Sequence, residues 1–418
     1  MEVNAGDTAW VLTATALVLF MTPGLAFFYG GMVRSKNVLG MLMQNFFAMG
    51  LIGVLWAAVG FSIAFGDGGG YVGNFDFAFM TDLVTKFNAD GTFVNPLPGL
   101  DFLTIPPIVF FAFQMMFAII TPALITGATA DRLKFKSYAI VIALWSVLVY
   151  SPIAHWVFSP TGWLFKRGAL DFAGGTAIHI NAGIAALVIV AIIGKRKGYP
   201  EQPMPPHNLP FTLLGTGILW FGWFGFNAGS AGAANSIAAH ALVNTSLAAS
   251  AAMLGWLVAE KLKDGHATTL GGASGAVAGL VAITPCAGYV GGMSPIIIGA
   301  IAGVVCYLAI SIKKALKLDD SLDVIAVHLV GGIVGSLLLG FFGDAAINSA
   351  GFDGVFFDGG TDLLVDQAVA VGAALVFSAV VTFIIAKAVD VIFGLRIDED
   401  AEDTGLDLSQ HAETAYSN

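Results

Sequence analysis

"GGTAIHINAGIAALVIVAIIGKRK", residues 174–197, decides the fold class. The stretch is long and apolar enough to cross the roughly 30 Å of a bilayer's hydrocarbon core, and a basic cluster ends it. His179 nevertheless lies within it, roughly 24 Å from Lys195 at the helical rise of about 1.5 Å per residue. Because an ionisable side chain at such depth is costly, it marks a functional path by default. The stretch therefore predicts a membrane-spanning helix that carries a functional histidine.

The composition of the whole chain is that of an integral membrane protein. Of its 418 residues, 57% are hydrophobic and 11% are charged, well outside the usual range of soluble domains. The spans must be helices, because lipid satisfies no backbone groups and the apolar runs lack the two-residue alternation of a barrel. The short, glycine-rich run 270–283 should pack among other helices. We expect eleven spans, at about 8–30, 41–65, 106–129, 138–158, 176–193, 209–227, 235–259, 270–283, 295–312, 325–342 and 364–395.

The basic residues set the orientation. When the loops are counted alternately, all of the 18 lysines and arginines except Lys86, Lys166 and Arg167 fall on one side. That side is cytoplasmic by the positive-inside rule, so the N-terminus is outside and the C-terminus inside, as an odd span count requires. The start, "MEVNAGD", has no basic segment, and no cleavable signal peptide is expected. We predict a multi-pass protein of the cell (inner) membrane.

The histidine segment has a counterpart later in the chain. "AIHINAGIAAL" (177–187) aligns with "AVHLVGGIVGSL" (326–337), and an acidic residue, Asp171 or Asp323, precedes each histidine. The segments are the fifth and tenth spans, so the repeat unit has five helices. A unit with an odd number of helices must be inserted in opposite directions in its two copies, with the substrate site near the repeat interface.

This symmetry defines the expected architecture and places two histidines together. We predict a transmembrane domain at 1–396, with repeats at about 8–193 and 209–342 and a last helix at 364–395. His179 and His328 should face one another deep in the membrane. Each could instead serve helix packing alone, by a hydrogen bond. Two symmetry-related imidazoles can satisfy each other while both stay neutral, which favours a path for something that hydrogen-bonds but need not be charged.

Other features narrow the substrate to a small cation. No lysine or arginine lies in the central part of a span, which argues against an anion carrier or a retinal protein, and no TVGYG-type potassium filter is present. The net charge of −10 gathers in outer loops and the tail, where it suits a cation or simply serves solubility. Aromatic faces attract partly dehydrated cations, and Ser230 could accept a hydrogen bond, although an interfacial belt is the alternative for Trp223. The residues at or just below the expected outer mouth are Phe113, Phe117, Trp223, Phe226 and Ser230.

Several longer motifs are specific to one family. "LVLFMTPGLAFFYGGMVRSKNVL", "GALDFAGG", "HIN", "HNLP", "GWFGFNAGSAG", "TPCAGY" and "GLDLSQHAETAY" resemble the ammonium transporter family (Amt/Mep/Rh), and its Amt branch most closely. The resemblance runs from the first span to the tail. It implies ammonium uptake by a homotrimer of eleven-helix protomers with one pathway in each subunit. No cofactor, metal or nucleic acid is expected.

The resemblance also implies roles for individual residues. Asp171 would support an external recruitment site from below, Trp223 would shape its vestibule and Ser230 would accept a bond from the ion. The stacked gate would be Phe117 and Phe226, and the pore lining His179 and His328. One position departs from the family: Phe158 in "HWVFSP" stands where a tryptophan usually forms a wall of the recruitment site. A phenyl ring has a weaker quadrupole and no N–H, so external binding should be weaker or less selective.

The residues and the resemblance together predict a mechanism. Moving a bare cation through hydrocarbon costs tens of kcal/mol in the idealised limit, whereas neutral ammonia is small and weakly hydrogen-bonding. Ammonium should be captured outside and lose its proton near the gate, and ammonia should pass the histidines and be reprotonated inside. We favour electrogenic transport, in which the proton follows separately. The alternatives are a passive NH3 or CO2 channel of the Rh type and an ammonium sensor. A membrane enzyme is disfavoured, because the histidine pair has no nucleophile or carboxylate partner at ligand spacing.

The segment 397–418 is polar and acidic and is predicted to be a cytoplasmic regulatory tail. A free acidic tail is the simpler interpretation. The family uses the matching "GLD" and "HGE" stretches to couple the tail to the pore base and to receive a P-II type signalling protein. Here the glycine of the second stretch is an alanine, which removes backbone freedom and weakens the case for docking. The expected regulatory residues are Gly405, Leu406, Asp407, His411 and Glu413.

Overall fold

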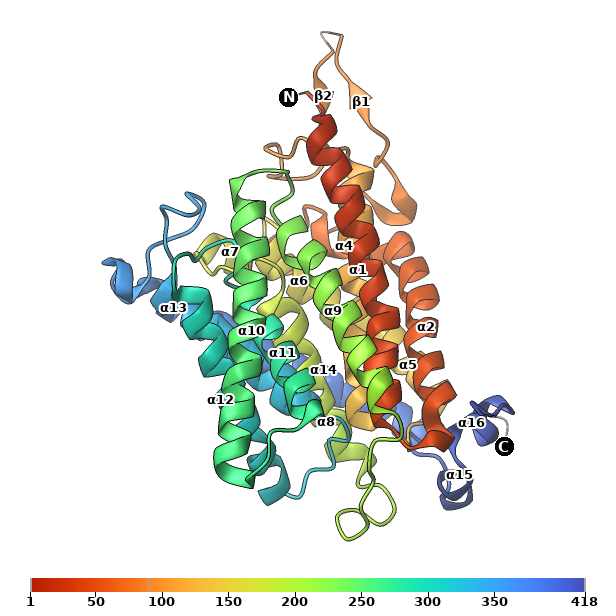
Figure 1. Cartoon of the computed structure of the whole chain (residues 1–418). Helices are drawn as coiled ribbons and strands as arrows, with labels where there is room; N and C mark the ends of the chain where they lie inside the picture. Colours follow the sequence, from red (N-terminus) through yellow and green to blue (C-terminus); the bar gives the residue numbers. More distant parts are fainter. Residues whose placement is uncertain (1, 90, 417–418) are drawn as a thin grey trace.

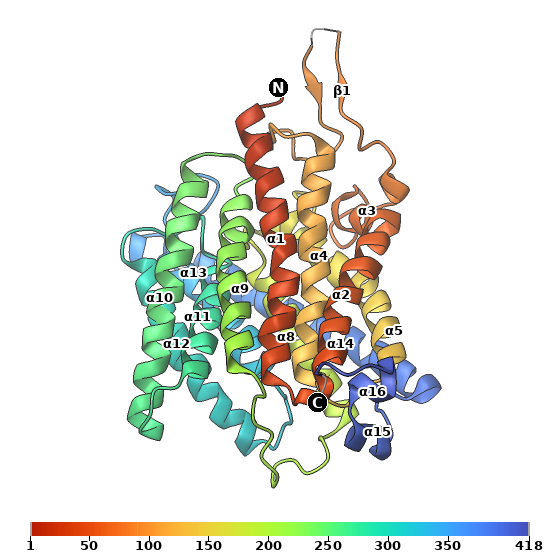
Figure 2. The ribbon, with the colours of Figure 1, turned by 45° about the vertical axis from the view of Figure 1, so that its right-hand side comes forward.

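The computed structural model describes residues 2–89 and 91–416 and is almost entirely helical (Figure 1). The helices form a bundle with the two termini at opposite ends, which a second view confirms (Figure 2). One short hairpin, β1 (Lys86–Phe87) paired antiparallel with β2 (Phe93–Val94), projects beyond the N-terminal end of the first helix. Residues 417–418 of the predicted tail lie outside the described residues.

Ten helices in the described part of the chain are long and apolar enough to cross a membrane, and an eleventh apolar helix is shorter. All eleven predicted spans therefore coincide with apolar helices. The total of eleven crossings remains a prediction. The helical segments are α1 (Ala5–Met32), η1 (Ser35–Asn37), α2 (Val38–Leu55), η2 (Trp56–Gly60), α3 (Phe61–Phe65), η3 (Ala78–Met80), α4 (Pro107–Thr129), α5 (Phe135–Trp145), η4 (Ser146–Tyr150), α6 (Ser151–Phe158), α7 (Trp163–Arg167), η5 (Gly175–Ile180), α8 (Asn181–Ile193), α9 (Leu209–Gly229), α10 (Ser236–Asp264), α11 (Thr269–Ile283), α12 (Ser294–Ala315), η6 (Ile325–Val330), α13 (Gly331–Phe342), η7 (Val355–Phe357), α14 (Asp362–Phe393), α15 (Glu399–Thr404) and α16 (Leu406–His411).

Side-chain caps explain where several of these helices begin. Asn4, Asn208 and Asn235 each accept a hydrogen bond from the backbone N–H three residues later, at 3.0–3.1 Å, at the starts of α1, α9 and α10. Thr268 does the same at α11, at 2.9 Å. Such caps satisfy one of the free N–H groups of a first turn, which matters most where a helix emerges at a membrane surface.

The short helix α11 is packed among its neighbours, as its glycine content predicts. Most of its residues are buried, and it contacts α9, α10, α12 and α13. A methyl group on Gly279 would lie 2.5 Å from the Ala248 carbonyl oxygen of α10, so the two backbones approach too closely for any larger residue. Both cysteines, Cys286 and Cys306, are free and buried.

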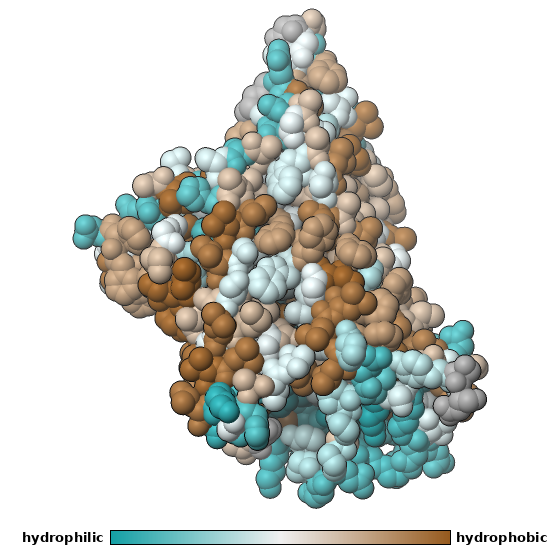
Figure 3. All heavy atoms as spheres, in the orientation of Figure 1, coloured by the Kyte–Doolittle hydropathy of each residue, from teal (hydrophilic) through white to brown (hydrophobic). Residues whose placement is uncertain are grey.

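The surface of the bundle is apolar around its middle. Figure 3 shows hydrophobic side chains across the centre of one face, with hydrophilic residues gathered at the end that carries the tail. Large apolar residues are exposed on the long helices, for example Val54, Leu254 and Val376. Exposed apolar area of this extent is unfavourable in water but is expected where helices contact lipid.

The two histidine-bearing spans begin alike, with a π-helical segment that a carboxylate caps. Asp171 accepts hydrogen bonds from the N–H groups at positions 174, 176 and 177, each at 3.0 Å. Before η6, Asp320 accepts from the N–H groups at 324 and 325, at 3.1 and 2.8 Å. Pairing Asp171 with Asp323 was therefore wrong, because Asp323 caps neither N–H and instead forms an ion pair with Lys313. Each capping carboxylate lies eight residues before its histidine, a spacing that is legible in the sequence.

Candidate functional site

The two predicted pore histidines meet in the centre of the bundle. His179 lies on η5 and His328 on η6, and each is 2% exposed. Their Nδ1 atoms are 3.2 Å apart, and their rings are nearly parallel, with centroids 5.3 Å apart at an angle of 18°. One ring can donate while the other accepts, so both imidazoles can be neutral. Nε2 of His179 is buried with no hydrogen-bond partner among the described residues, which leaves it available to a passing molecule.

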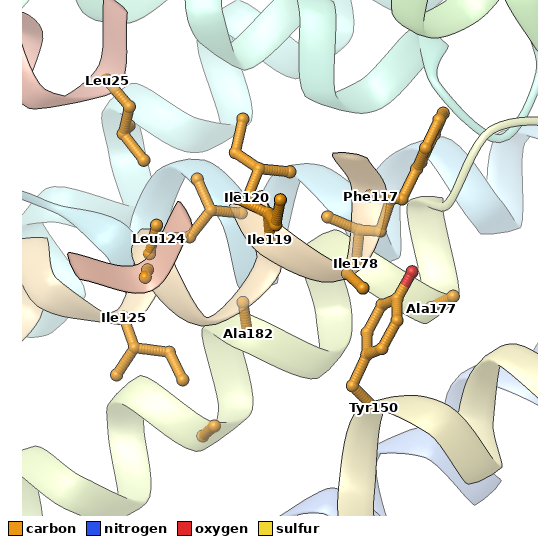
Figure 4. Packing of buried hydrophobic residues seen from close by; sticks show 14 of the residues in the cluster. Leu25, Phe117, Ile119, Ile120, Leu124, Ile125, Tyr150, Ala177, Ile178 and Ala182 are labelled. Atoms are coloured by element: carbon orange, nitrogen blue, oxygen red, sulfur yellow. The ribbon is translucent and has the colours of Figure 1, made fainter. Parts of the chain in front are cut away.

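The histidines face a narrow, largely apolar cavity. The open space is about 10 Å³, room for roughly one water-sized molecule. Besides the histidines, its walls are aliphatic or aromatic and include Leu25, Trp223 and Phe226. Figure 4 shows Leu25, Ile120 and Leu124 in the packed cluster around it. Such a lumen admits a small neutral molecule far more readily than a hydrated ion.

Two phenyl rings close the cavity on the side of α4 and α9. Phe117 and Phe226 pack against each other with centroids 4.4 Å apart at 33°, and each is 1% exposed. Phe113 lies against Phe117 at 4.8 Å, and Phe226 lies 6.1 Å from the ring of His179. Phe117, Tyr150, Ala177 and Ile178 belong to one cluster of buried hydrophobic residues (Figure 4). The phenyl pair thus separates the histidines from the end of α9 that bears Ser230.

Trp223 lies deeper than its predicted place at or just below the outer mouth. Its indole is 2% exposed, stacks on His179 at 5.5 Å and 19°, and donates from Nε1 to the Thr284 hydroxyl at 2.9 Å. The physical reason is the helical rise. Trp223 comes three residues before Phe226 on α9, so it lies about one turn closer to the start of that helix and farther from Ser230. It is a wall of the histidine cavity rather than of a vestibule.

The other expected recruitment residues are only partly brought together. The Ser230 hydroxyl is partly exposed and donates to the Phe226 carbonyl at 2.8 Å, so its lone pairs stay free to accept from a cation. Phe158, at the end of α6, is half-buried, and within the described chain it makes no ring-to-ring contact with Phe117 or Phe226. Asp171 is buried beneath, and burial raises the pKa of its carboxyl to about 6 although three N–H groups bind it.

The tail is docked on the bundle rather than free. Asp407 accepts from the Gly40 N–H, and the Leu406 N–H donates to the side chain of Asn37, both at 2.8 Å. Gly405 has φ +104°, a conformation that favours glycine at the turn between α15 and α16. The His411 ring packs edge-on against Phe135 at 5.1 Å, and the Glu413 N–H donates to the Asp407 carbonyl.

An ionic contact that sequence reasoning missed also holds the tail. The Glu402 carboxylate is almost fully buried, pairs with Arg396 at 2.6 Å and accepts from the Lys197 N–H at 2.7 Å. Nothing in the sequence distinguishes Glu402 from its acidic neighbours, because its burial arises only from the docking of α15. The tail thus joins α2 to the loop that follows α8.

Comparisons with known proteins agree over the whole chain. Residues 9–416 match the model of the Ammonium Transporter Family. An ammonium transporter of Mycobacterium tuberculosis (strain H37Rv) is 50% identical over 99% of this chain and 90% of its own length. Ammonium transporter Amt1 of Archaeoglobus fulgidus is 44% identical over 99% of both chains. The crystal structure of Saccharomyces cerevisiae Mep2 superposes with a TM-score of 0.87 at 34% identity, covering 96% of this chain and 89% of that one.

Proposed function

The chain belongs to the ammonium transporter family, and we propose that it takes up ammonium by stripping the ion of a proton and conducting ammonia past His179 and His328. The observation that carries this mechanism is the hydrogen-bonded pair of imidazoles, with Nδ1 atoms 3.2 Å apart, enclosed behind two closely packed, tilted phenyl rings. A cavity for about one water-sized molecule cannot hold a hydrated ion, and its apolar walls cannot replace the lost hydration shell.

The steps follow from the order of the groups along the bundle. Ammonium is recruited at the outer end, where Ser230 offers an acceptor and the aromatic rings a negative face. Near Phe117 and Phe226 its proton passes to the imidazole pair, and ammonia enters the cavity, where an imidazole nitrogen hydrogen-bonds it. A proton rejoins it on the cytoplasmic side. Potassium has no proton to give up and stays outside.

We infer that transport carries charge. The two Nδ1 atoms are close enough to hand a proton from one ring to the other. The test is current on a solid-supported membrane after an ammonium jump with purified protein. Ammonium-dependent current supports the mechanism. Ammonia flux, read from internal pH, without current would establish a passive gas channel instead.

The architecture that we propose is a homotrimer of protomers built from two inverted five-helix repeats and a last helix. The equivalent carboxylate caps before His179 and His328 support the repeat, and family membership supports the trimer. With the N-terminus outside, the basic end of the bundle and the tail face the cytoplasm. Native mass spectrometry of the protein in detergent tests the trimer directly.

Restoring the usual ring at position 158 should strengthen recruitment. In Phe158→Trp the larger indole quadrupole should lower the KM for ammonium by about twofold to fivefold, with little change in maximal current. A change of this size corresponds to one partly exposed cation–π contact. Current measured over a range of ammonium concentrations checks this. Phe165→Trp, an exposed position on α7, is the matched control for an added indole.

We propose that the docked tail regulates the pore base and receives a P-II type signalling protein at the cytoplasmic face. Asp407→Ala removes the acceptor for the Gly40 N–H and should free the tail, reducing transport several-fold. Limited proteolysis should then cut near α16 at lower protease concentrations. Asp403→Ala breaks only an exposed pair with Lys197 and should change neither result. Equal effects of the two substitutions would contradict a specific role for Asp407.

A further inference from the structure

A tyrosine continues the wall of the histidine cavity toward the end of the bundle that carries the tail. Tyr29 lies on α1, four residues after Leu25 and eight after Met21, and both of those side chains line the cavity. Residues four apart share one side of a helix, so the three side chains follow one another along the same face. The Tyr29 ring is 1% exposed, and its hydroxyl donates to the Leu124 carbonyl of α4 at 3.1 Å. The mechanism proposed above makes no use of this side chain.

The tyrosine ring is packed tightly where three spans meet. A methyl group added at Gly127 of α4 would lie 2.6 Å from Cζ of Tyr29 and 2.8 Å from Cγ2 of Val324, which directly precedes η6. A Cβ atom does not approach other carbons so closely, so the ring occupies this position only because residue 127 is a glycine. The contact joins α1, α4 and the start of η6.

A second cavity, of about 340 Å³, lies beyond this contact. Asp320 and Ser321 line it, and the Ser321 N–H donates to the Ala128 carbonyl at 3.3 Å. The rest of its lining comes from the loop after α8, the end of α12 and the turn that follows. A cavity of this size holds several water molecules, whereas the histidine cavity has room for roughly one.

The order of residues along α4 places the Tyr29 ring between the two cavities. Leu124, whose carbonyl binds the tyrosine, lines the histidine cavity. Gly127 borders the ring about one turn later. The next residue, Ala128, is bonded to Ser321 of the second cavity.

The span of the second histidine repeats this order. His328 lines the histidine cavity, and Val324, four residues before it, borders the same glycine as the Tyr29 ring. Asp320, another four residues earlier, lines the second cavity. Because two spans agree, the ring separates a narrow apolar cavity from a larger one that has room for water.

We propose that Tyr29 is the inner gate of the pathway, a ring that closes the histidine cavity toward the second cavity and moves aside to release ammonia. The proposal rests on the proposed transport function. The closed position is held by one neutral hydrogen bond, to Leu124, which is weak enough to break at each passage. With the phenyl pair closed on the other side, no continuous file of water crosses the bundle, and a dry constriction of this kind excludes ions.

Removing only the hydroxyl should speed the release of ammonia. Tyr29→Phe keeps the ring but loses the bond to the Leu124 carbonyl, so the ring should leave its closed position more readily. The maximal ammonium current should rise about twofold to tenfold, the factor that corresponds to one neutral hydrogen bond, with little change in KM. Current on a solid-supported membrane over a range of ammonium concentrations measures both. A maximal current equal to or below that of the wild type would overturn the proposal.

Tyr138→Phe is the matched control. The Tyr138 hydroxyl, on α5, donates to the Gln44 carbonyl at 2.8 Å and is buried outside the histidine cavity. Both substitutions remove the same kind of bond, so the melting temperatures should fall alike, while the current of Tyr138→Phe stays that of the wild type. An equal rise of current in both variants would mean that a loosened bundle, rather than the ring of Tyr29, sets the rate.

The closure can also be measured without transport. Leu25→Cys places a thiol in the histidine cavity, and the native Cys286 and Cys306, which are buried and do not line it, serve as internal controls. Purified protein in detergent is treated with methyl methanethiosulfonate, a small neutral thiol reagent, and labelling is followed by mass spectrometry. Adding Tyr29→Ala should speed labelling at position 25 by about tenfold to hundredfold, because the rate follows the fraction of molecules in which the passage is open. Equal rates would show that the ring does not close the cavity.

Two provisions keep the outcomes distinct. If the alanine variant does not fold, Tyr29→Phe takes its place and should raise the labelling rate about twofold to tenfold. An unchanged rate in that variant would likewise overturn the proposal. If the wild type carries no ammonium current, the proposed function fails, whereas the labelling rates still decide whether Tyr29 closes the cavity.

Discussion

Replacing both histidines, His179→Ala with His328→Ala, is expected to lower the ammonium-dependent current by about tenfold to hundredfold. This is the cost of removing one or two buried hydrogen-bonding groups from the path. The substitutions also widen the cavity, so water can enter and a potassium current should appear. Current on a solid-supported membrane after separate ammonium and potassium jumps measures both effects. Each single variant should lose nearly as much ammonium current as the double one, because a relay across the 3.2 Å contact needs both rings.

His240→Ala is the matched control, since His240 is exposed on α10 and lies outside the cavity. Its currents should equal those of the wild type. Full ammonium current in the double variant, without potassium leak, would mean that the histidines are only packing residues. Ammonium current carried by the double variant together with a large potassium current would assign them selectivity but no relay.

The sequence predicted which two histidines lie together better than it predicted the depth of Trp223. His179 and His328 could be paired because their segments align in the sequence, and the symmetry predicted from that alignment is a strong constraint on position. Phe117 of α4 and Phe226 of α9 pack against each other, and their role as a gate stays a prediction. Trp223 was placed too far out, since a run of aromatics on one helix does not reveal which turn faces the lumen and which the surface.

Contacts between loops were beyond sequence reasoning. The alignment of the two histidine segments paired Asp171 with Asp323, whereas the capping of η6 by Asp320 depends on a turn that only the fold defines. The buried Glu402 has the same origin. Its carboxylate accepts from the N–H of Lys197, which lies far away in the chain, and no periodicity marks such a pair. The eight-residue spacing from Asp320 to His328 was the one signal available for the missed cap.

Removing the charge of Asp171 should reduce transport without unfolding the protein. In Asp171→Asn one side-chain oxygen still accepts from the N–H groups at the start of η5, but the negative charge near the outer mouth is gone. The ammonium current should therefore fall about tenfold, which corresponds to the loss of one hydrogen bond to a charged group. Asp171→Ala leaves three buried N–H groups unpaired and should lower the melting temperature as well. Current and thermal unfolding, measured on the same preparations, separate the two effects.

The pH dependence of the wild type offers a second test of the same carboxylate. Because burial raises the pKa of Asp171 to about 6, its carboxyl takes up a proton as the external pH falls from 7 to 5, whereas an exposed aspartate would stay charged. The wild-type current should therefore fall over this range toward that of Asp171→Asn, whose own current should not change. Asp320→Asn alters the equivalent cap at the other end of the bundle and should keep the wild-type response to external pH. If Asp171→Asn retains that response too, another group titrates, and Asp171 acts only as a helix cap.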